Sequence, residues 1–249
     1  MVEIGGQVPG EDPGTGFRAF GEGLSVSSDG GKVSFWASWG TQTFQKTLLC
    51  PTDGNPDIVA YCNQLHPTGL VVNIPVNQGI FVHDAATGVT TRVARTGAEG
   101  IEDFVFWGFS GRPPGVGGGD EPGTELARWR SSAFAALSPI ANGSAFVAFK
   151  AQRNGLDGLF LREGLSFQLQ LQTIAQVNVT SGTAIDPMAP AGSLISSVGI
   201  EREGFRNGRV AVNLGMLYVD PMDPDTTVGW GGIYVAPVAV SLIFQDGFE

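Results

Sequence analysis

The stretch Leu24-Ser-Val-Ser-Ser-Asp-Gly-Gly-Lys-Val-Ser-Phe-Trp-Ala37 decides the fold class, because it reads as a strand, a tight glycine-containing turn and a second strand. The same order recurs in Ala136–Ala151 and in Val198–Val212. Helical periodicity is nearly absent, and only Glu125–Leu137 forms a short candidate helix. The sequence therefore predicts an all-β chain that is built from three repeats.

Each repeat is expected to continue with a third strand that opens on glycine: Gly79–Val82, Gly158–Leu161 and Gly232–Val235. A fourth strand is expected at Thr91–Ala94 in the first repeat and at Gln172–Ala175 in the second. Four antiparallel strands joined by tight turns describe a propeller blade. The third repeat lacks a fourth strand of its own, and Val2–Val8 reads as an isolated strand. Pairing of Val2–Val8 with Val238–Phe244 would close a ring of blades.

The first repeat, Ser25–Phe35 followed by Gly79–Val93, resembles the TolB/WD40-like β-propeller repeat. That family has a Ser-x-Asp-Gly turn before a strand, then a strand with Tyr or Phe, an Asp and a Thr-Gly turn. The resemblance implies a β-propeller-like toroid of four-stranded antiparallel blades, and it implies no activity. Three repeats are fewer than the four to eight blades usual in a propeller. A β-trefoil or a β-prism, each with pseudo-threefold repeats, is the alternative.

The length of 249 residues suits one large all-β domain. We expect residues 1–249 to form a single repeat domain with insertions at about 41–78 and 108–130. Within the first insertion, Thr43–Leu49 and Leu70–Val76 read as strands. The first insertion could therefore build a degenerate blade.

The charge balance argues against nucleic acid as a partner, because 14 basic residues stand against 24 acidic ones and only three of the basic residues are lysines. The longest apolar stretch, Tyr234–Phe244, is too short to span a bilayer. No membrane span is expected. The sequence leaves the oligomeric state open.

The two cysteines, Cys50 and Cys62, bracket a segment rich in turn-forming residues, and we interpret them as a disulfide rather than as two free thiols. A disulfide indicates an oxidising compartment. Residues 1–20 contain no apolar signal-peptide core. The C-terminal Ile243–Glu249 resembles tails of exported proteins of Gram-negative bacteria. We expect a mature protein that is secreted or periplasmic.

Few residues offer catalytic or metal chemistry. The candidates for an acid and a base are Tyr61, His66, His83 and Arg112. Arg92 is a further candidate for binding a substrate carboxylate. Two carboxylate clusters, at residues 99–103 and 201–203, suit a glycosidase or a solvated face. With two histidines and two paired cysteines, no metal site and no cofactor are expected. Ca²⁺ binding by Asp53–Asp57 or Asp220–Asp225 is unsupported, since neither matches an EF-hand loop.

Aromatic residues form two similar motifs, Phe35-Trp36-Ala-Ser-Trp39-Gly40 and Phe106-Trp107-Gly-Phe109-Ser-Gly111. Neighbouring aromatics lie on opposite faces of a strand, so one of Trp36 and Trp39, and one of Trp107 and Phe109, is expected to face away from the core. Packing between blades is one interpretation of these side chains. A stacking platform for sugar rings is the other.

Two functions of different class follow. The first is an exported, non-catalytic β-propeller module that binds glycans or partner proteins through loops and exposed aromatics. The alternative is a secreted polysaccharide-active enzyme, a lyase or a glycoside hydrolase, with a His/Tyr/Arg or carboxylate site. The first is preferred, because no group of residues has the spacing that catalysis requires.

Overall fold

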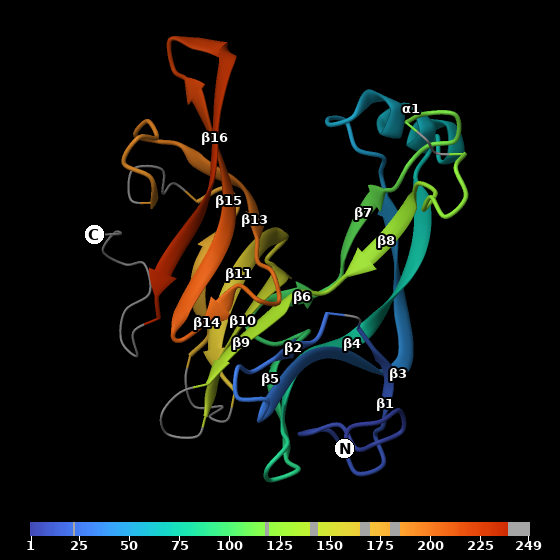
Figure 1. Ribbon diagram of the computed structural model, residues 1–249, viewed down its shortest axis with the longest axis vertical. Coiled ribbons are helices and arrows are strands. Elements are labelled where there is room, and N and C mark those ends of the chain that lie inside the picture. Colours follow the sequence, from blue (N-terminus) through green and yellow to red (C-terminus); the bar gives the residue numbers. More distant parts are fainter. Residues whose placement is uncertain (22, 118–119, 140–143, 165–169, 180–184, 239–249) are drawn as a thin grey trace. The chain divides into compact units, whose positions relative to one another are not determined.

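The computed structural model describes residues 1–249 apart from 22, 118–119, 140–143, 165–169, 180–184 and 239–249 (Figure 1). Its elements in chain order are β1 (Phe17–Phe20), β2 (Ser25–Val26), β3 (Lys32–Leu48), α1 (Pro56–Leu65), β4 (Leu70–Asp84), β5 (Thr90–Arg95), β6 (Ile101–Asp103), β7 (Phe106–Ser110), β8 (Arg128–Ser132), β9 (Ala135–Pro139), β10 (Ala145–Arg153), β11 (Leu156–Glu163), β12 (Gln172–Gln176), β13 (Leu194–Gly199), β14 (Phe205–Arg206), β15 (Arg209–Asp220) and β16 (Asp223–Pro237). The all-β class is confirmed.

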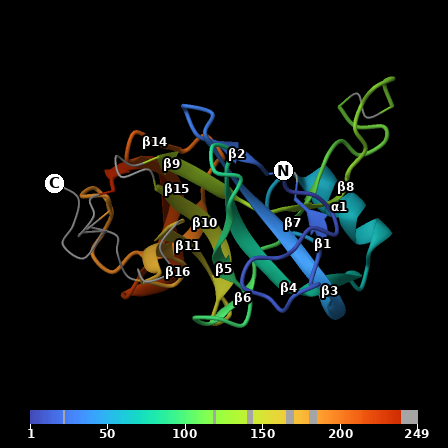
Figure 2. The ribbon, with the colours of Figure 1, turned by 90° about the horizontal axis from the view of Figure 1, so that it is seen from below.

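Each repeat forms an antiparallel sheet, and in the first two sheets β2 to β5 and β9 to β12 lie side by side in chain order. The first sheet has the order β2-β3-β4-β5, and β1 also pairs with β3 (Figure 2). The second sheet has the order β9-β10-β11-β12, and β6 pairs with the end of β10. In the third sheet β15 lies between β16 on one side and β13 and β14 on the other. None of the described sheets closes into a barrel, and their arrangement as propeller blades stays a prediction.

Beyond the first two strands of each repeat, the sequence predicts three third strands and two fourth strands, and all five are confirmed. The three glycine-led segments lie in β4, β11 and β16, and the two expected fourth strands are β5 and β12. Among the described residues, the third sheet has no fourth strand beside β16.

Short-range polar contacts fix the turns of the first sheet. Asp29 accepts hydrogen bonds from the Ser27 hydroxyl and from the Gly31 amide, and Gly30 has a φ of 72°. Across the sheet, Asp84 accepts hydrogen bonds from the amides of the turn that follows it. Lys32 forms a buried ion pair with Asp84, and this contact lowers the pKa of the Asp84 carboxyl to about 2. The Ser-x-Asp-Gly turn and the Asp before the Thr-Gly turn are thus joined by one lysine.

The other two sheets use Asn-Gly hairpins. Asn154 and Gly155, between β10 and β11, both have positive φ, and so do Asn207 and Gly208, between β14 and β15. Such turns match the twist of antiparallel strands.

The helix expected at Glu125–Leu137 is wrong. That segment contains β8 and the first three residues of β9, and these strands pair with β7 and β10. The helix of the described chain is α1, inside the first insertion. Asn55 caps it by accepting hydrogen bonds from two backbone amides, and Pro56 occupies the first helical turn. The Asn-Pro pair was the local signal for this helix start.

The strand expected at Val2–Val8 is also wrong. The amides of Gly5 and Val8 donate to the carbonyls of Phe17 and Thr15, and Gln7 forms one isolated bridge. The segment therefore folds back on the residues that follow it. Most of its expected partner, residues 239–244, lies outside the described residues, so ring closure stays a prediction.

The chain divides into two compact units. One consists of Met1–Gly40, Asn77–Phe104 and Ala133–Glu249, and the other of Thr41–Val76 and Val105–Ser132. The second unit contains nearly all of the two ranges expected as insertions. β3 and β4 each run from the first unit into the second.

The larger hydrophobic core of the first unit lies between the second and third sheets. Phe146 and Leu161 of the second sheet and Leu214 and Met216 of the third belong to it, and all four are at least 95% buried. A smaller core on the first sheet gathers Phe17, Phe35, Ala37, Trp39 and Phe81.

Candidate functional site

The second unit is built around a disulfide. Cys50, which follows β3, is bonded to Cys62 of α1, so the predicted disulfide is confirmed. Cys62 is fully buried against Phe109 of β7 and Ala127, which precedes β8. The disulfide therefore ties α1 to the end of β3, and the packing of Cys62 places α1 beside the β7–β8 hairpin.

The ring of Phe109 is the centre of an aromatic cluster. Its centroid lies 5.6 Å from that of Trp129, 6.2 Å from that of His66 and 6.4 Å from that of Tyr61. The Trp129 and His66 rings meet it edge to face, which is a favourable geometry for aromatic pairs. Phe109 is buried, whereas the other three side chains are half-buried. The central ring of the cluster is thus shielded from solvent, whereas the three rings around it are partly accessible.

Two indole groups share one face of the β7–β8 hairpin. Trp107 and Phe109 are two residues apart on β7, and Phe109 lies opposite Trp129 on β8, so all three point to the same face. The expectation that one of Trp107 and Phe109 faces away from the other is therefore wrong, because residues two apart lie on the same side of a strand. The Nε1 atoms of Trp107 and Trp129 are buried and have no hydrogen-bond partner in the described part of the chain. A buried N–H donor without a hydrogen-bond acceptor lowers the stability of the folded state.

Arginine side chains of β8 are held by one carboxylate. Glu125 lies 2.7 Å from Arg130 Nη1 and 2.9 Å from Arg128 Nη2. The hydrogen bond from Arg130, followed by the weaker effect of Arg128, holds the pKa of the Glu125 carboxyl below its ordinary value. Arg112 is exposed, and its Nη1 donates to the carbonyl of Gly117 at 2.7 Å. The hairpin therefore carries several oriented N–H donors.

Three of the four aromatic residues predicted for binding are buried. Trp36 and Trp39 are 9% and 3% exposed, and Phe109 is 8% exposed. The Trp36 Nε1 atom donates to the Gln78 side chain at 3.1 Å, and Trp39 packs against Phe81. The expectation that these three rings offer a free face to a ligand is therefore wrong, because packing around the first sheet and under the hairpin covers them. Trp107 alone remains half-buried.

The histidines belong to different units. His66 and Tyr61 lie in the second unit beside Phe109, whereas His83 lies in the first, where its Nδ1 atom is 3.0 Å from the hydroxyl of Thr90. The structure thus brings Tyr61 and His66 to one ring. Convergence of these two with His83 stays a prediction.

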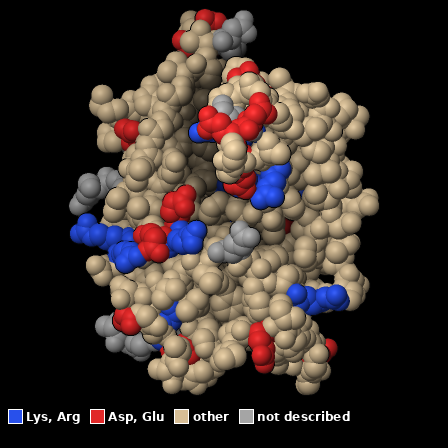
Figure 3. All heavy atoms as spheres, turned by 45° about the vertical axis from the view of Figure 1, so that its right-hand side comes forward, with Lys and Arg blue, Asp and Glu red and all other residues tan. Residues whose placement is uncertain are grey.

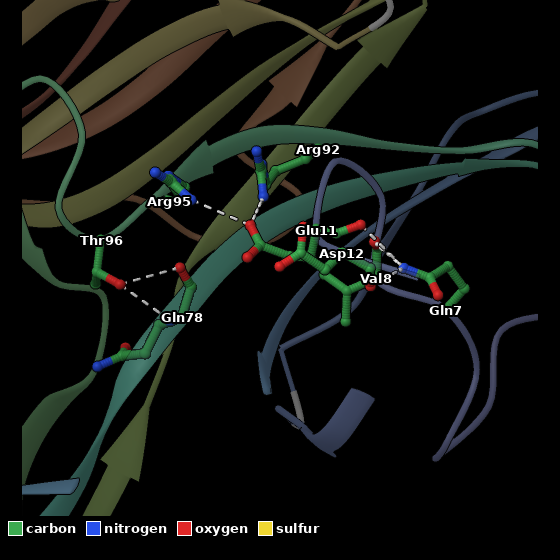
Figure 4. A network of polar contacts seen from close by, with 8 residues as sticks. All are labelled: Gln7, Val8, Glu11, Asp12, Gln78, Arg92, Arg95 and Thr96. Carbon is green, nitrogen blue, oxygen red and sulfur yellow. Dashed lines mark hydrogen bonds and ion pairs between the residues drawn. The ribbon is translucent and has the colours of Figure 1, made fainter. Parts of the chain in front are cut away.

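Arg92, the alternative candidate for a substrate carboxylate, is already paired within the first unit. It forms an ion pair with Glu11, which Arg95 Nη1 also approaches at 3.1 Å (Figure 4). Beside this contact, Gln7 donates through its side-chain amide to the carbonyls of Val8, Glu11 and Asp12. The N-terminal turn is thereby fastened to β5.

The carboxylate clusters also have internal partners. Glu99 pairs with Arg162, Glu102 accepts a hydrogen bond from the Gly155 amide, and Glu203 pairs with Arg206. Asp103 is buried and accepts from the Gln78 side chain at 3.0 Å. These contacts favour a structural role over a glycosidase pair.

Trp129 and Arg130 are not among the candidate residues predicted from the sequence, because the segment around them was interpreted as a helix. In Arg128-Trp-Arg-Ser-Ser132 an aromatic residue alternates with charged residues. This alternation is typical of a half-buried strand and could have identified them.

No three His, Cys, Asp or Glu side chains of the described residues gather as metal ligands would. Within the same residues, no helix has the length and apolarity needed to cross a bilayer. No protein-family model, no curated protein and no solved structure matches the chain.

Proposed function

We propose that the chain is an exported, non-catalytic module that binds glycans through the second unit, on a scaffold of propeller-like repeats. The observation that carries this proposal is the pair of half-buried indoles, Trp107 and Trp129, whose N–H groups share one hairpin face and have no acceptor among the described residues. Trp107 belongs to the motif that the sequence marked for binding.

The chemistry of a sugar ring suits this face. A pyranose has an apolar C–H face that packs on a flat aromatic ring, and hydroxyl oxygens at its edge that accept hydrogen bonds. The half-buried indoles supply the ring, and their Nε1 atoms, which are buried in the free chain, can donate to a hydroxyl only when ligand binding opens the margin of the cluster. The side chains of Arg128 and Arg130 flank Trp129 along β8 and therefore leave the hairpin on its opposite face, where Glu125 holds them, so the proposal rests on the indoles and not on these two arginines.

Charge and chemistry of the remaining surface agree with a weakly charged ligand. The chain has a formal net charge of −10 and only 15% charged residues. Figure 3 shows a face on which such residues form small, separate groups. A phosphate-rich ligand would meet no extended basic patch there. The Cys50–Cys62 disulfide is compatible with an extracellular or periplasmic protein, which is where free polysaccharide is found.

Affinity electrophoresis tests the proposal. The intact protein is run through gels that contain neutral or uronic-acid polysaccharides, and we expect at least one to retard it. Trp129→Ala should weaken binding by at least roughly tenfold, because the ring contact is lost. Trp129→Phe keeps an aromatic ring and removes only the N–H donor, so a loss of about fivefold is expected.

The matched control is Trp230→Phe, which removes the N–H of a half-buried tryptophan in the first unit. It should leave retardation unchanged. Equal effects of Trp129→Phe and Trp230→Phe, or no retardation in any gel, would contradict the proposal.

One observation favours catalysis as the second candidate: Tyr61 and His66 both lie beside the Phe109 ring. A lyase or hydrolase that uses them would release new chain ends from a polysaccharide. Tyr61→Phe and His66→Ala would then abolish product release while binding persists. Loss of turnover with binding retained would replace the non-catalytic function with this one.

A further inference from the structure

One face of the third sheet is exposed and carries a group of large apolar side chains, with Asn213 opposite Ile233 and Thr227 opposite Val219. We call it the outer face. It carries the side chains of alternate residues, and its large members are Leu194, Leu217, Val219, Ile233 and Val235. Their exposed fractions range from 40% to 77%, whereas the residues between them, such as Leu214 and Met216, are about 2% exposed or less and belong to the core. Figure 1 shows the three strands that carry the outer face, β13, β15 and β16.

The corresponding faces of the first two sheets are covered. In β10, the neighbouring Ala148 and Phe149 point to opposite faces of the sheet and are both fully buried. The same holds for Leu159 and Phe160 of β11, and for Ile80 and Phe81 of β4. The outer face is therefore the exception among the three repeats, since the described residues leave it without a covering layer.

Glycines make the middle of the outer face flat. A side chain added at Gly229 or Gly231 would meet nothing nearer than 3.7 Å within the chain, and neither residue has positive φ. Neither packing nor backbone conformation within this sheet requires glycine there. Glycine in a strand interior often marks close approach by another backbone or ligand. Large apolar patches on a soluble protein likewise mark interaction sites.

We propose that the outer face binds a second copy of this chain, face to face, about a twofold axis. A twofold interface requires a self-complementary patch. The outer face meets that requirement, because Ile233 and Val235 project next to the flat strip at Gly229 and Gly231. Each copy can place its projecting side chains over the glycines of the other. Sheets pack in this way at roughly 10 Å separation in β-sandwiches.

The charged residues at the two ends of the outer face indicate the direction of the twofold axis. Arg209 lies at one end of the outer face, is exposed and forms no ion pair with another described residue. Asp220 and Asp223 lie at the other end, where they accept hydrogen bonds from the Met222 amide and from the Thr226 hydroxyl. An axis that runs across the strands brings Arg209 of one copy to the acidic turn of the other. An axis along the strands would instead place the two acidic turns together, which is unfavourable.

Sedimentation velocity over a concentration series tests the dimer. We expect the intact protein to dimerise with a Kd below roughly 100 μM. The double variant Ile233→Lys/Val235→Lys should raise the dimer Kd by roughly a hundredfold, because it buries charges without partners. Val89→Lys is the control, since Val89 is 54% exposed in a turn of the first sheet. A monomeric parent, or an unchanged Kd in the double variant, would overturn the proposal.

Two further variants test the flat strip and the charges. Gly231→Val fits within the monomer, so its melting temperature should stay the same or rise while the dimer Kd rises roughly tenfold through overpacking. Arg209→Glu should weaken the dimer, and the charge swap Arg209→Glu/Asp223→Arg should restore it. An unchanged Kd in both single variants would overturn the face-to-face arrangement.

Hydrogen exchange distinguishes the second copy from the chain's own C-terminal residues as the occupant. If a second copy covers the outer face, amide protection in residues 226–236 rises with protein concentration and survives deletion of residues 239–249. Protection that is independent of concentration and lost on this deletion would assign the face to the C-terminal segment and overturn the dimer.

Discussion

The second and third sheets come from repeats of the same kind, yet they differ in how many faces they bury. Consecutive residues of β10 and β11, such as Leu159 and Phe160, are fully buried, whereas burial in β15 alternates from one residue to the next. The sequence carries this difference: Ala145-Phe-Val-Ala-Phe149 is continuously apolar, and Arg209-Val-Ala-Val-Asn-Leu214 alternates larger apolar residues with small or polar ones. A continuous apolar run indicates a strand that is covered on both faces. Strand periodicity therefore reports the surroundings of each repeat as well as its secondary structure.

The largest expected difference between the sheets is in stability. Phe160→Ala in the second sheet should lower the free energy of unfolding by about 3–5 kcal/mol, because the side chain is fully buried. Ile233→Ala on the outer face should change it by less than about 0.5 kcal/mol in the monomer. Urea denaturation at low protein concentration measures both. Similar losses in the two variants would mean that the chain itself covers the outer face.

The second prediction compares the second and third sheets with the second unit in their dependence on the disulfide. Replacing Cys50 and Cys62 together by Ala removes the disulfide and should cost about 2–3 kcal/mol, as expected for a short closed loop. The loss should appear as faster hydrogen exchange in α1 and β7, while β10 and β15 keep their protection. Uniform loss of protection through all three sheets would show that the two units unfold together.

The smallest expected effect concerns Tyr234, on the core side of β16. Burial, reinforced by the hydrogen bond to Asp186, raises the pKa of Tyr234 to about 12. Because the folded state favours the protonated phenol, its contribution is complete below about pH 10 and is lost as the pH rises through 12. Tyr234→Phe should cost about 1 kcal/mol at neutral pH and flatten this alkaline decline. A parent and a variant that lose stability in parallel above pH 10 would contradict this prediction.

The sequence predicted the strands well, because their signals are local. Val-Ile-Phe runs between glycine turns marked the strands, and the Ser27-Ser-Asp-Gly30 turn formed as its residues suggest. Trp129 and Arg130 were missed because a short apolar segment fits both a helix and a strand until its partner, β7, is known. Burial of Trp36 and Trp39 depends on contacts with distant strands, and no local pattern specifies such contacts.

Gly40 and Asn77 mark where the chain leaves the first unit and returns to it along β3 and β4. The two residues are neighbours, since a side chain built at Gly40 would come within 2.9 Å of the Asn77 amide. Because the two ends of the inserted segment are neighbours, closing it costs little conformational entropy and takes little stability from the sheet that carries it. Residues 41–76, together with the hairpin that packs on α1, thus resemble an exchangeable cassette. Protein engineers could swap or shorten this cassette to graft new recognition loops onto an unaltered scaffold.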